Sequence, residues 1–337
     1  MRFNKKLVTT AVGASLALSA GAANAYVHAD FYAIFFPYVV KDTNRTTVIT
    51  VISANDSRTT SNQDLHIQYW TKSTTAANTA ACEPNSSFMQ ITPNDIVSFD
   101  TAGLLGFPLF GDTTNAAPLG ASIAYASPRH GYLLVDDANN DLAGGFWMEL
   151  DFANGGAYGD IGLGVYNDTD LTNELFNAHS LLSDTTASIT NASPVIFWPA
   201  SVASTVFTVT PIGTNMLNSD NNSVVMQVFN SNLVQGAYDR NENGVDGTVP
   251  QTVRCVGRLT AAQLMPGVVA NAAWAATGGW GYLANLGNGN ALPAQTDPCS
   301  ASGDCKAVVY QVDTSNAAGA GKFMSNATMI TSYNGGN

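Results

Sequence analysis

The sequence predicts an all-β protein, in which two tandem, duplicated β-sandwich domains (Ig-like or jelly-roll-like) follow a cleaved signal peptide. Three observations lead to this prediction. Short runs of β-branched and aromatic residues recur along the chain, clusters of Asn, Asp, Gly, Ser and Pro separate them, and helical periodicity is scarce. Short strands at this density favour a sandwich over alternating β/α units.

The first 25 residues have the organisation of a secretory signal peptide. Three basic residues precede an apolar run from Leu7 to Leu18, and Ala23-Asn24-Ala25 closes it. Because this run is too short to span a bilayer, we expect its removal and a mature protein that begins near Tyr26, outside the cytoplasm. No later segment offers an apolar run of membrane-spanning length, which predicts a protein that is secreted or held at the cell surface without membrane insertion.

The composition argues against nucleic-acid and anionic-membrane partners. The whole chain has a net charge of −12, and removal of the three basic residues of the leader takes it to −15. Such partners require a basic face that displaces counterions. Only 11% of residues are charged, against about a quarter in typical proteins. We therefore expect a neutral, polar surface.

The strands are expected where β-branched and aromatic residues concentrate. The clearest run is Thr46–Ile52, which reads Thr-Thr-Val-Ile-Thr-Val-Ile. Further strands are expected at Leu65–Trp70, Ile96–Phe99, Tyr132–Val135, Phe146–Phe152, Ile161–Tyr166, Val206–Thr210, Val224–Phe229 and Ala307–Val312. Only Leu171–Leu182 and Thr260–Leu264 have weak helical character, and Arg129-His130 after Pro128 is expected to form a turn.

A short sequence motif that occurs in both halves of the chain predicts the duplication. Ile34-Phe35-Phe36-Pro37 recurs as Ile196-Phe197-Trp198-Pro199, and each copy leads into a strand rich in Thr and Val. Each half then contains a cysteine, a related phrase (89–96 and 257–264) and a late apolar strand. We expect domains at 26–188 and 189–337, with the boundary in the Ser/Thr/Asn-rich stretch 183–193.

The four cysteines favour two disulfides in an oxidising compartment. Cys299 and Cys305 flank a flexible Ser-Ala-Ser-Gly-Asp turn, and by elimination Cys82 would pair with Cys255. Free buried thiols are the alternative for the second pair. No Cys-x-x-Cys spacing supports zinc, and the missing Cys-x-x-Cys-His motif excludes covalently attached c-type haem.

One acidic segment matches the front half of a calcium loop. Asp239, Asn241 and Asn243 carry oxygen ligands at alternate positions, and Gly244 would allow the sharp turn. The twelfth position is Pro250 instead of a bidentate Glu, so Asp246 or a distant carboxylate would have to complete the shell. Two interpretations stay open, a Ca²⁺ site that stiffens the loop and an ordinary Asx/Gly turn.

Glu149 and Asp151 are the best candidates for catalysis, because residues i and i+2 of a strand face the same side. Glu149-Leu150-Asp151 resembles the start of the E-x-D-x-x-E signature of laminarinase-like glycoside hydrolases. Asn154 occupies the position of the acid/base Glu in that signature, so the leaving group would lack a proton donor. We therefore expect no enzymatic activity.

Aromatic residues offer a binding site of a different kind. Trp274, Trp280 and Tyr282 lie among glycines in a segment that resembles a loop. Exposed aromatic rings stack on sugars, and glycine allows a ligand to approach closely. A buried aromatic core is the alternative for the same residues.

Several phrases of the first half resemble a family of uncharacterised, exported β-sandwich proteins of sediment-dwelling bacteria. These phrases are Phe36–Val40, Thr46–Ser53, Leu65–Trp70 and Thr92–Asp100. The resemblance implies an extracellular β-sandwich and no catalytic residues.

The function expected from the sequence is therefore a secreted or cell-surface, non-enzymatic structural or adhesive protein. Its partners would be other extracellular protein subunits, as in a calcium-stabilised assembly or filament, or surface glycans. The alternative is a carbohydrate-binding module or a degenerate glycosidase-like lectin. The apolar stretch Phe31–Val40 would be an edge strand of its own domain or a strand donated to a neighbouring subunit.

Overall fold

The structure is a computed structural model. The described residues are 31, 33–53, 63–92, 95–105, 109, 128–137, 142–165, 192–212, 216, 223–230, 236–270, 272–286, 306–316 and 324–332. Within them nearly all regular structure is β, and every strand pairing is antiparallel, which confirms the all-β prediction. The signal segment, Cys299, Cys305 and the predicted helix 171–182 lie outside the described residues.

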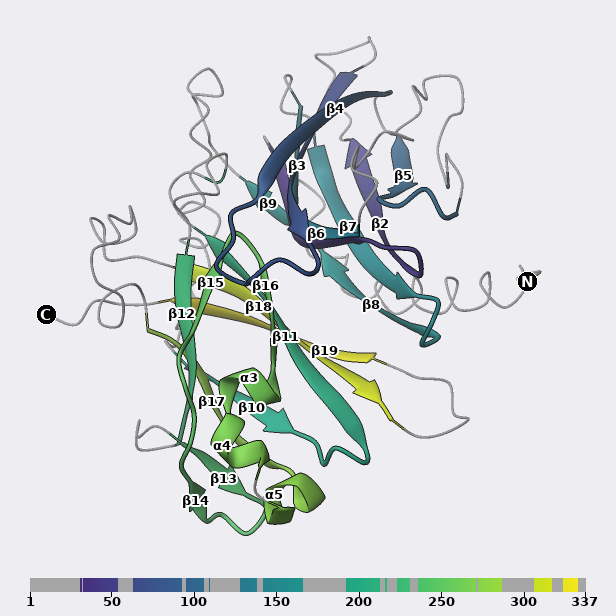
Figure 1. Cartoon of the computed structure of the whole chain (residues 1–337). Helices are drawn as coiled ribbons and strands as arrows, with labels where there is room; N and C mark the ends of the chain where they lie inside the picture. Colours follow the sequence, from purple (N-terminus) through teal and green to yellow (C-terminus); the bar gives the residue numbers. More distant parts are fainter. Residues whose placement is uncertain are drawn as a thin grey trace, which may run out of the picture.

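The first half of the chain forms one nine-stranded sheet, the upper part of Figure 1. Its strands are β1 (Ala33–Lys41), β2 (Arg45–Ser53), β3 (Gln63–Ser73), β4 (Glu83–Ile91), β5 (Ile96–Asp100), β6 (Arg129–Asp137), β7 (Leu142–Asp151), β8 (Gly156–Ile161) and β9 (Leu163–Val165). Their order is β4-β3-β6-β1-β2-β7-β8, with β5 against β2 and β9 against β1.

The second half forms two smaller sheets, the lower part of Figure 1. The six-stranded sheet contains β10 (Ala192–Phe197), β12 (Ser223–Phe229), β13 (Ala237–Asp239), β14 (Gly244–Val245), β15 (Gln251–Arg254) and β17 (Gly279–Asn285). The four-stranded sheet contains β16 (Gly257–Thr260), β11 (Ala203–Ile212), β18 (Lys306–Ser315) and β19 (Met324–Ser332). Three short helices, α3 (Ala261–Leu264), α4 (Pro266–Val269) and α5 (Ala272–Thr277), lie between β16 and β17.

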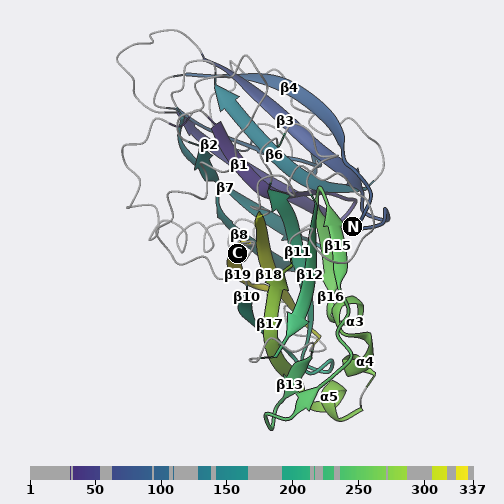
Figure 2. The same ribbon diagram turned by 90° about the vertical axis from the view of Figure 1, so that its left-hand side faces the viewer.

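The four-stranded sheet lies between the other two, and its strands β11 and β18 are buried on both faces. In β18 successive side chains belong alternately to the two hydrophobic cores on either side of this sheet. Val308, Tyr310 and Val312 belong to the core under the nine-stranded sheet, whereas Ala307 and Val309 belong to the core under the six-stranded sheet. Successive side chains of a strand point to opposite faces, so one strand serves two cores. Figure 2 shows the resulting stack, with the nine-stranded sheet above the two sheets of the second half.

Every stretch predicted as a strand from its β-branched residues forms one. The prediction did not include β4, β10, β13, β14, β15, β16, β17 and β19. The predicted strand 161–166 is divided by Gly162 into the end of β8 and β9. The helical prediction at 260–264 is confirmed by α3, which begins with a capping box in which Thr260 and Gln263 bond each other's backbone.

Two local predictions are wrong. Arg129 and His130 do not form a turn but begin β6, where both side chains are buried. β1 is not an edge strand, since β6 pairs with it on one side and β9 on the other. In both cases long-range pairing overrides a local signal, the preceding proline in the first and the position near the chain start in the second.

Candidate functional site

The outer side of the six-stranded sheet presents a row of apolar and aromatic side chains. Strand β10 alternates strictly: Val195 and Phe197 are buried in the core, whereas Pro194 and Ile196 are exposed. In the register with β17, Pro194 lies opposite Tyr282 and Ile196 lies opposite Trp280. Directly opposed residues share a face, so both rings of β17 lie on the outer side.

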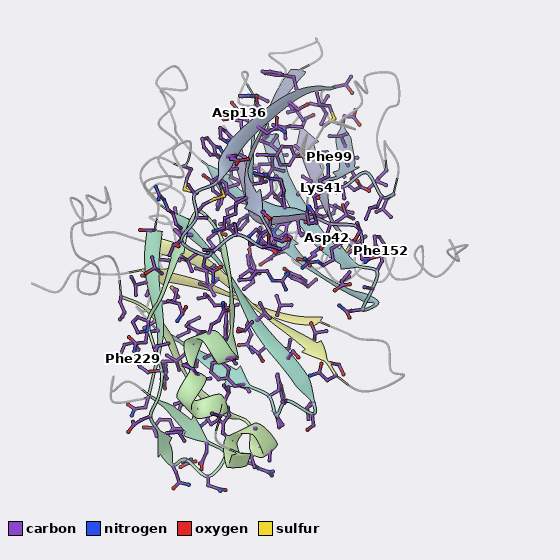
Figure 3. The ribbon with its side chains drawn as sticks, viewed as in Figure 1. Lys41, Asp42, Phe99, Asp136, Phe152 and Phe229 are labelled. Atoms are coloured by element: carbon purple, nitrogen blue, oxygen red, sulfur yellow. A yellow bond between two sulfur atoms is a disulfide. The ribbon has the colours of Figure 1, made fainter. Side chains whose placement is uncertain are left out.

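Neighbouring strands extend this row. Tyr238 of β13 is paired with Trp280, and their rings stack with centroids 4.7 Å apart. The Trp280 and Tyr282 rings meet edge to face at 5.9 Å. Phe229, which is paired with Tyr282, extends the row on β12 (Figure 3). We call the set Pro194, Ile196, Phe229, Tyr238, Trp280 and Tyr282 the aromatic face.

The aromatic face keeps part of its apolar surface in contact with solvent. Ile196 is 53% exposed, and Trp198, two residues further along the chain, is 45% exposed. A contiguous apolar patch on a protein surface commonly marks a site of interaction, and aromatic residues combine a large contact area with a polar atom at the rim. The face can therefore bind a flat, partly apolar ligand.

The third predicted aromatic ligand residue, Trp274, does not belong to this face. It lies on α5, is 3% exposed and packs against Phe197 in the core of the second half. The segment predicted as a loop is instead α5 followed by β17. On the inner side of β17, Gly279 leaves the space that the Trp274 ring occupies. For Trp274 the core alternative is correct, since the nearby glycine admits an internal ring and not a ligand.

The segment predicted to bind calcium forms the hairpin between β13 and β14, beside the aromatic face. Asp239 organises it: Oδ1 accepts hydrogen bonds from the backbone N–H groups of Asn241 (2.8 Å) and Asn243 (2.9 Å), and Oδ2 accepts one from Asn243 Nδ2 (3.0 Å). These bonds, first those from Asn243, lower the pKa of Asp239. Of the predicted ligands, Asp239 and Asn243 are in contact, and the geometry is that of an Asx turn.

The sharp bend of this hairpin is not at Gly244. Gly244 starts β14 without a positive φ, whereas Glu242 has a φ of 65°. Among the described residues, no group of three or more His, Cys, Asp or Glu side chains is placed to hold a metal ion. A cation at the hairpin would need oxygens from Asn241, Asn243 or Asp246 turned toward Asp239.

Glu149 and Asp151 are engaged in structural contacts. The Glu149 carboxylate is buried, accepts a 2.7 Å hydrogen bond from the Tyr158 hydroxyl and lies 3.8 Å from the Arg45 guanidinium. Asp151 accepts a 2.9 Å hydrogen bond from the backbone N–H of Asn154, the residue at the position of the missing acid. The two carboxylates therefore hold the end of β7 in place.

Glu149 belongs to a polar cluster between the nine-stranded and four-stranded sheets. Burial raises the pKa of Tyr38, against the opposing charge of Arg258, and also raises the pKa of Tyr158. Burial, reinforced by the charges of Lys72 and Arg258, lowers the pKa of His130 to about 3. No described group hydrogen-bonds either nitrogen of His130, whose ring packs edge-on against Tyr38. The imidazole is therefore neutral at ordinary pH.

A second junction joins the halves through the loop between β3 and β4. The structure contains the predicted disulfide between Cys82 and Cys255. Asn78 reinforces it: its backbone oxygen accepts from Arg254 N (2.9 Å), and its side chain bonds both the N–H and the carbonyl of Arg258. We call these contacts the clasp.

The buried side chain of Lys72 also belongs to the clasp. Its ammonium donates to the carbonyl oxygens of Ala77, Asn78, Ala80 and Arg254, at 2.9–3.2 Å. Burial and the Arg254 charge lower the pKa of Lys72 to about 7, whereas the four carbonyl dipoles favour the protonated form. One side chain thus binds the β3–β4 loop to the second half of the chain.

Sequence reasoning missed several residues of these sites. In the aromatic face they are Pro194, Ile196, Phe229 and Tyr238, and in the clasp they are Lys72 and Asn78. Residues 194–198 read Pro-Val-Ile-Phe-Trp and are apolar throughout, so no alternation in the sequence separates the outer side of β10 from its buried side. The role of Asn78 depends on a contact with a residue 180 positions away, which no local pattern shows.

Comparisons of the chain with protein-family models, with curated proteins and with solved structures found no match. None of the helices in the described part of the chain is long and apolar enough to cross a membrane.

Proposed function

We propose that this chain is an exported, non-enzymatic adhesive protein that binds neutral polysaccharide through the aromatic face. The observation that carries the proposal is the row of rings on β13 and β17, where Tyr238, Trp280 and Tyr282 contact one another on the outer side of a sheet. The leader-like segment and the Cys82–Cys255 disulfide support an extracellular setting.

The charges around the aromatic face support a neutral ligand. In or beside the hairpin at its rim, Asp239, Glu242 and Asp246 outnumber the one cation, Arg240, and the chain as a whole carries a net charge of −12. An anionic polymer would be repelled by this rim. The ring edges, the tyrosine hydroxyls and the indole N–H suit a sugar polymer, which offers both C–H surfaces and hydroxyl groups.

The surroundings of Glu149 support a non-enzymatic role. A retaining or inverting glycosidase requires two carboxyl groups that reach the substrate from opposite sides of the scissile bond. Glu149 instead faces Tyr158 and Arg45 in the polar cluster, and Asp151 caps the turn that contains Asn154. In the proposed protein both carboxylates contribute to the fold.

Co-sedimentation with insoluble neutral polysaccharides tests the proposal. We expect binding by the native chain and a loss of about fivefold in affinity for Trp280→Ala and for Tyr282→Ala, since an aromatic contact contributes about 1 kcal/mol. Phe88→Ala is the matched control, because Phe88 is an exposed aromatic residue of the other half. Equal binding by all four proteins would refute the role of the aromatic face.

A hydrolase assay separates adhesion from catalysis. Release of soluble sugar by the native chain that disappears in Glu149→Gln would overturn the non-enzymatic proposal.

Thermal unfolding in EDTA tests calcium binding separately. If the hairpin binds Ca²⁺, the thermal midpoint falls in EDTA for the native chain but not for Asp239→Asn. An unchanged midpoint in the native chain removes calcium from the proposal.

A further inference from the structure

The N-terminal strand β1 takes nearly all its strand partners from distant parts of the chain. It pairs with its sequence neighbour β2 only at Lys41–Thr46. All its other pairings are with β6 and β9: Lys41 lies opposite Arg129, and Ala33 lies opposite both Asp136 and Val165. These partners follow 88 to 132 residues later in the chain, so they are synthesised well after β1.

A groove made by glycines receives the β1 segment. An added Cβ at Gly162 would clash with Ile34 and Phe36, and one at Gly145 would clash with Phe36 and with the β2 backbone. The ring of Phe31, just before β1, fills the corresponding space at Gly164. We call this space, bounded by β6 and β9, the β1 groove. Its shape is specific for the side chains of β1, which are buried at every position from 33 to 40.

Threonine side chains bind the backbone of β1 where strands do not. A bulge at Pro37 shifts the register between Phe36 and Val39. In this stretch the Pro37 carbonyl accepts a hydrogen bond from Thr210, and the Val40 carbonyl accepts one from Thr101. The Val40 N–H donates to Thr47 Oγ1 at 2.9 Å. These side chains satisfy the backbone of whichever β1 strand occupies the groove.

A short hinge connects β1 to β2. Residues 42–44 form the turn, which is closed by a hydrogen bond from Asp42 N to Arg45 O (2.9 Å) and by a 3.0 Å ion pair between the same two residues. Asn44 O accepts a hydrogen bond from Phe152 N (2.8 Å). If this turn opens, β1 and β2 become one extended run, 33–53, and β1 points away from its own sheet.

We propose that β1 is an exchangeable strand, which inserts into the β1 groove of a second copy of this chain. The second copy offers every contact described above, including the Lys41–Thr46 pairing, so exchange changes only the hinge. The proposed exchange rests on the export proposed above and not on glycan binding: in an exported chain β1 would emerge before β6 and β9 can cover it, when partners from another molecule are available.

Cross-linking between two differently tagged variants tests the exchange. Ala33→Cys is placed in one copy and Asp136→Cys in the other, because these residues lie opposite each other in the β1–β6 register. The two proteins are refolded together under oxidising conditions, and the disulfide is located by peptide mass spectrometry. We expect an intermolecular disulfide between position 33 of one copy and position 136 of the other, in a folded dimer or in a longer ladder.

The controls use the same register. Asp137→Cys replaces Asp136→Cys in the first control, since neighbouring residues of β6 face opposite sides. A single chain with both Ala33→Cys and Asp136→Cys shows that the pair can form the bond. If this double variant cross-links internally and the mixture gives no intermolecular bond, the proposal is overturned.

A hinge series gives a second, independent readout by light scattering. Deletion of Thr43 prevents the closed turn, so we expect the dimer fraction to rise at least tenfold over the native chain. Insertion of three glycines after Thr43 relaxes the turn and lowers the dimer fraction. A Thr43 deletion variant that folds as a monomer at all accessible concentrations overturns the exchange, and this readout decides even if the cysteine pair fails to oxidise.

Discussion

The two copies of the phrase Ile-Phe-(Phe/Trp)-Pro occupy different surroundings. In β1 the residues Ile34, Phe35 and Phe36 are all fully buried, whereas in and after β10 only Phe197 is buried, and Ile196 and Trp198 are about half exposed. The local sequences are nearly equal. The difference arises because β1 lies inside a sheet whose neighbours cover both its faces, whereas the outer side of β10 is the aromatic face.

The strand pairing of the two copies differs as well. β1 pairs with β6, the late apolar strand of its half, but β10 pairs with β17, and the late strand β18 pairs with β11. Two copies of a sequence motif can therefore occupy different positions in their sheets. The strand pairings do not repeat from one half to the other, and the duplication stays a prediction.

The largest effect is expected at the link between the two halves. The Cys82–Cys255 disulfide closes a loop of 173 residues, and its removal in Cys82→Ala/Cys255→Ala should lower the free energy of unfolding by about 5 kcal/mol on the chain-entropy account. Urea unfolding followed by tryptophan fluorescence measures it, with Cys299→Ala/Cys305→Ala as the control. An equal loss in both variants would contradict a special role for the long-range bond.

The two copies of the phrase should respond very differently to truncation. Phe36→Ala empties a space in the glycine-lined groove of β1 and should destabilise by about 3–5 kcal/mol. Trp198→Ala removes a half-exposed ring and should change stability by less than about 1 kcal/mol. Denaturation midpoints compare them directly. Similar losses would show that the outer side of β10 is covered in solution.

Acid should lower the free energy of unfolding through His130, whose ring packs against Tyr38 of β1. Its pKa is about 3 when folded and about 6.5 when unfolded, so the unfolded chain binds more protons and stability is lost as pH falls from 6.5 toward 3. At pH 4 this amounts to about 3 kcal/mol. His130→Phe should abolish this share of the loss, whereas His66→Gln, on the surface of β3, should not. Parallel pH curves for the native chain and His130→Phe would contradict the assignment.

Local signals in the sequence predicted many of the strands and the short helix α3, whereas the pairing of Cys82 with Cys255 was predicted by elimination. They could not predict the surroundings of those elements. The alternation in β18 is compatible with one buried face or two, and only the position of the nine-stranded sheet decides this. Likewise, the glycines near Trp280 indicate that another group approaches the strand closely, but not on which face. In the structure this group is the Trp274 ring, which lies against Gly279 on the inner face of β17.

The smallest effect distinguishes the two interpretations of the acidic hairpin beside the aromatic face. Glu242 has a left-handed backbone, with a φ of 65°, so Glu242→Gly should stabilise by about 0.5–1 kcal/mol. Gly244 lies in β14 without a positive φ, and no atom lies within 4 Å of an added Cβ. Gly244→Ala should therefore be nearly neutral. A calcium loop with its bend at Gly244 reverses this order: Gly244→Ala would then destabilise by more than about 1 kcal/mol, and only when Ca²⁺ is present. Thermal melts of both variants in Ca²⁺ and in EDTA separate the two geometries, because only a bound ion makes the difference depend on the metal.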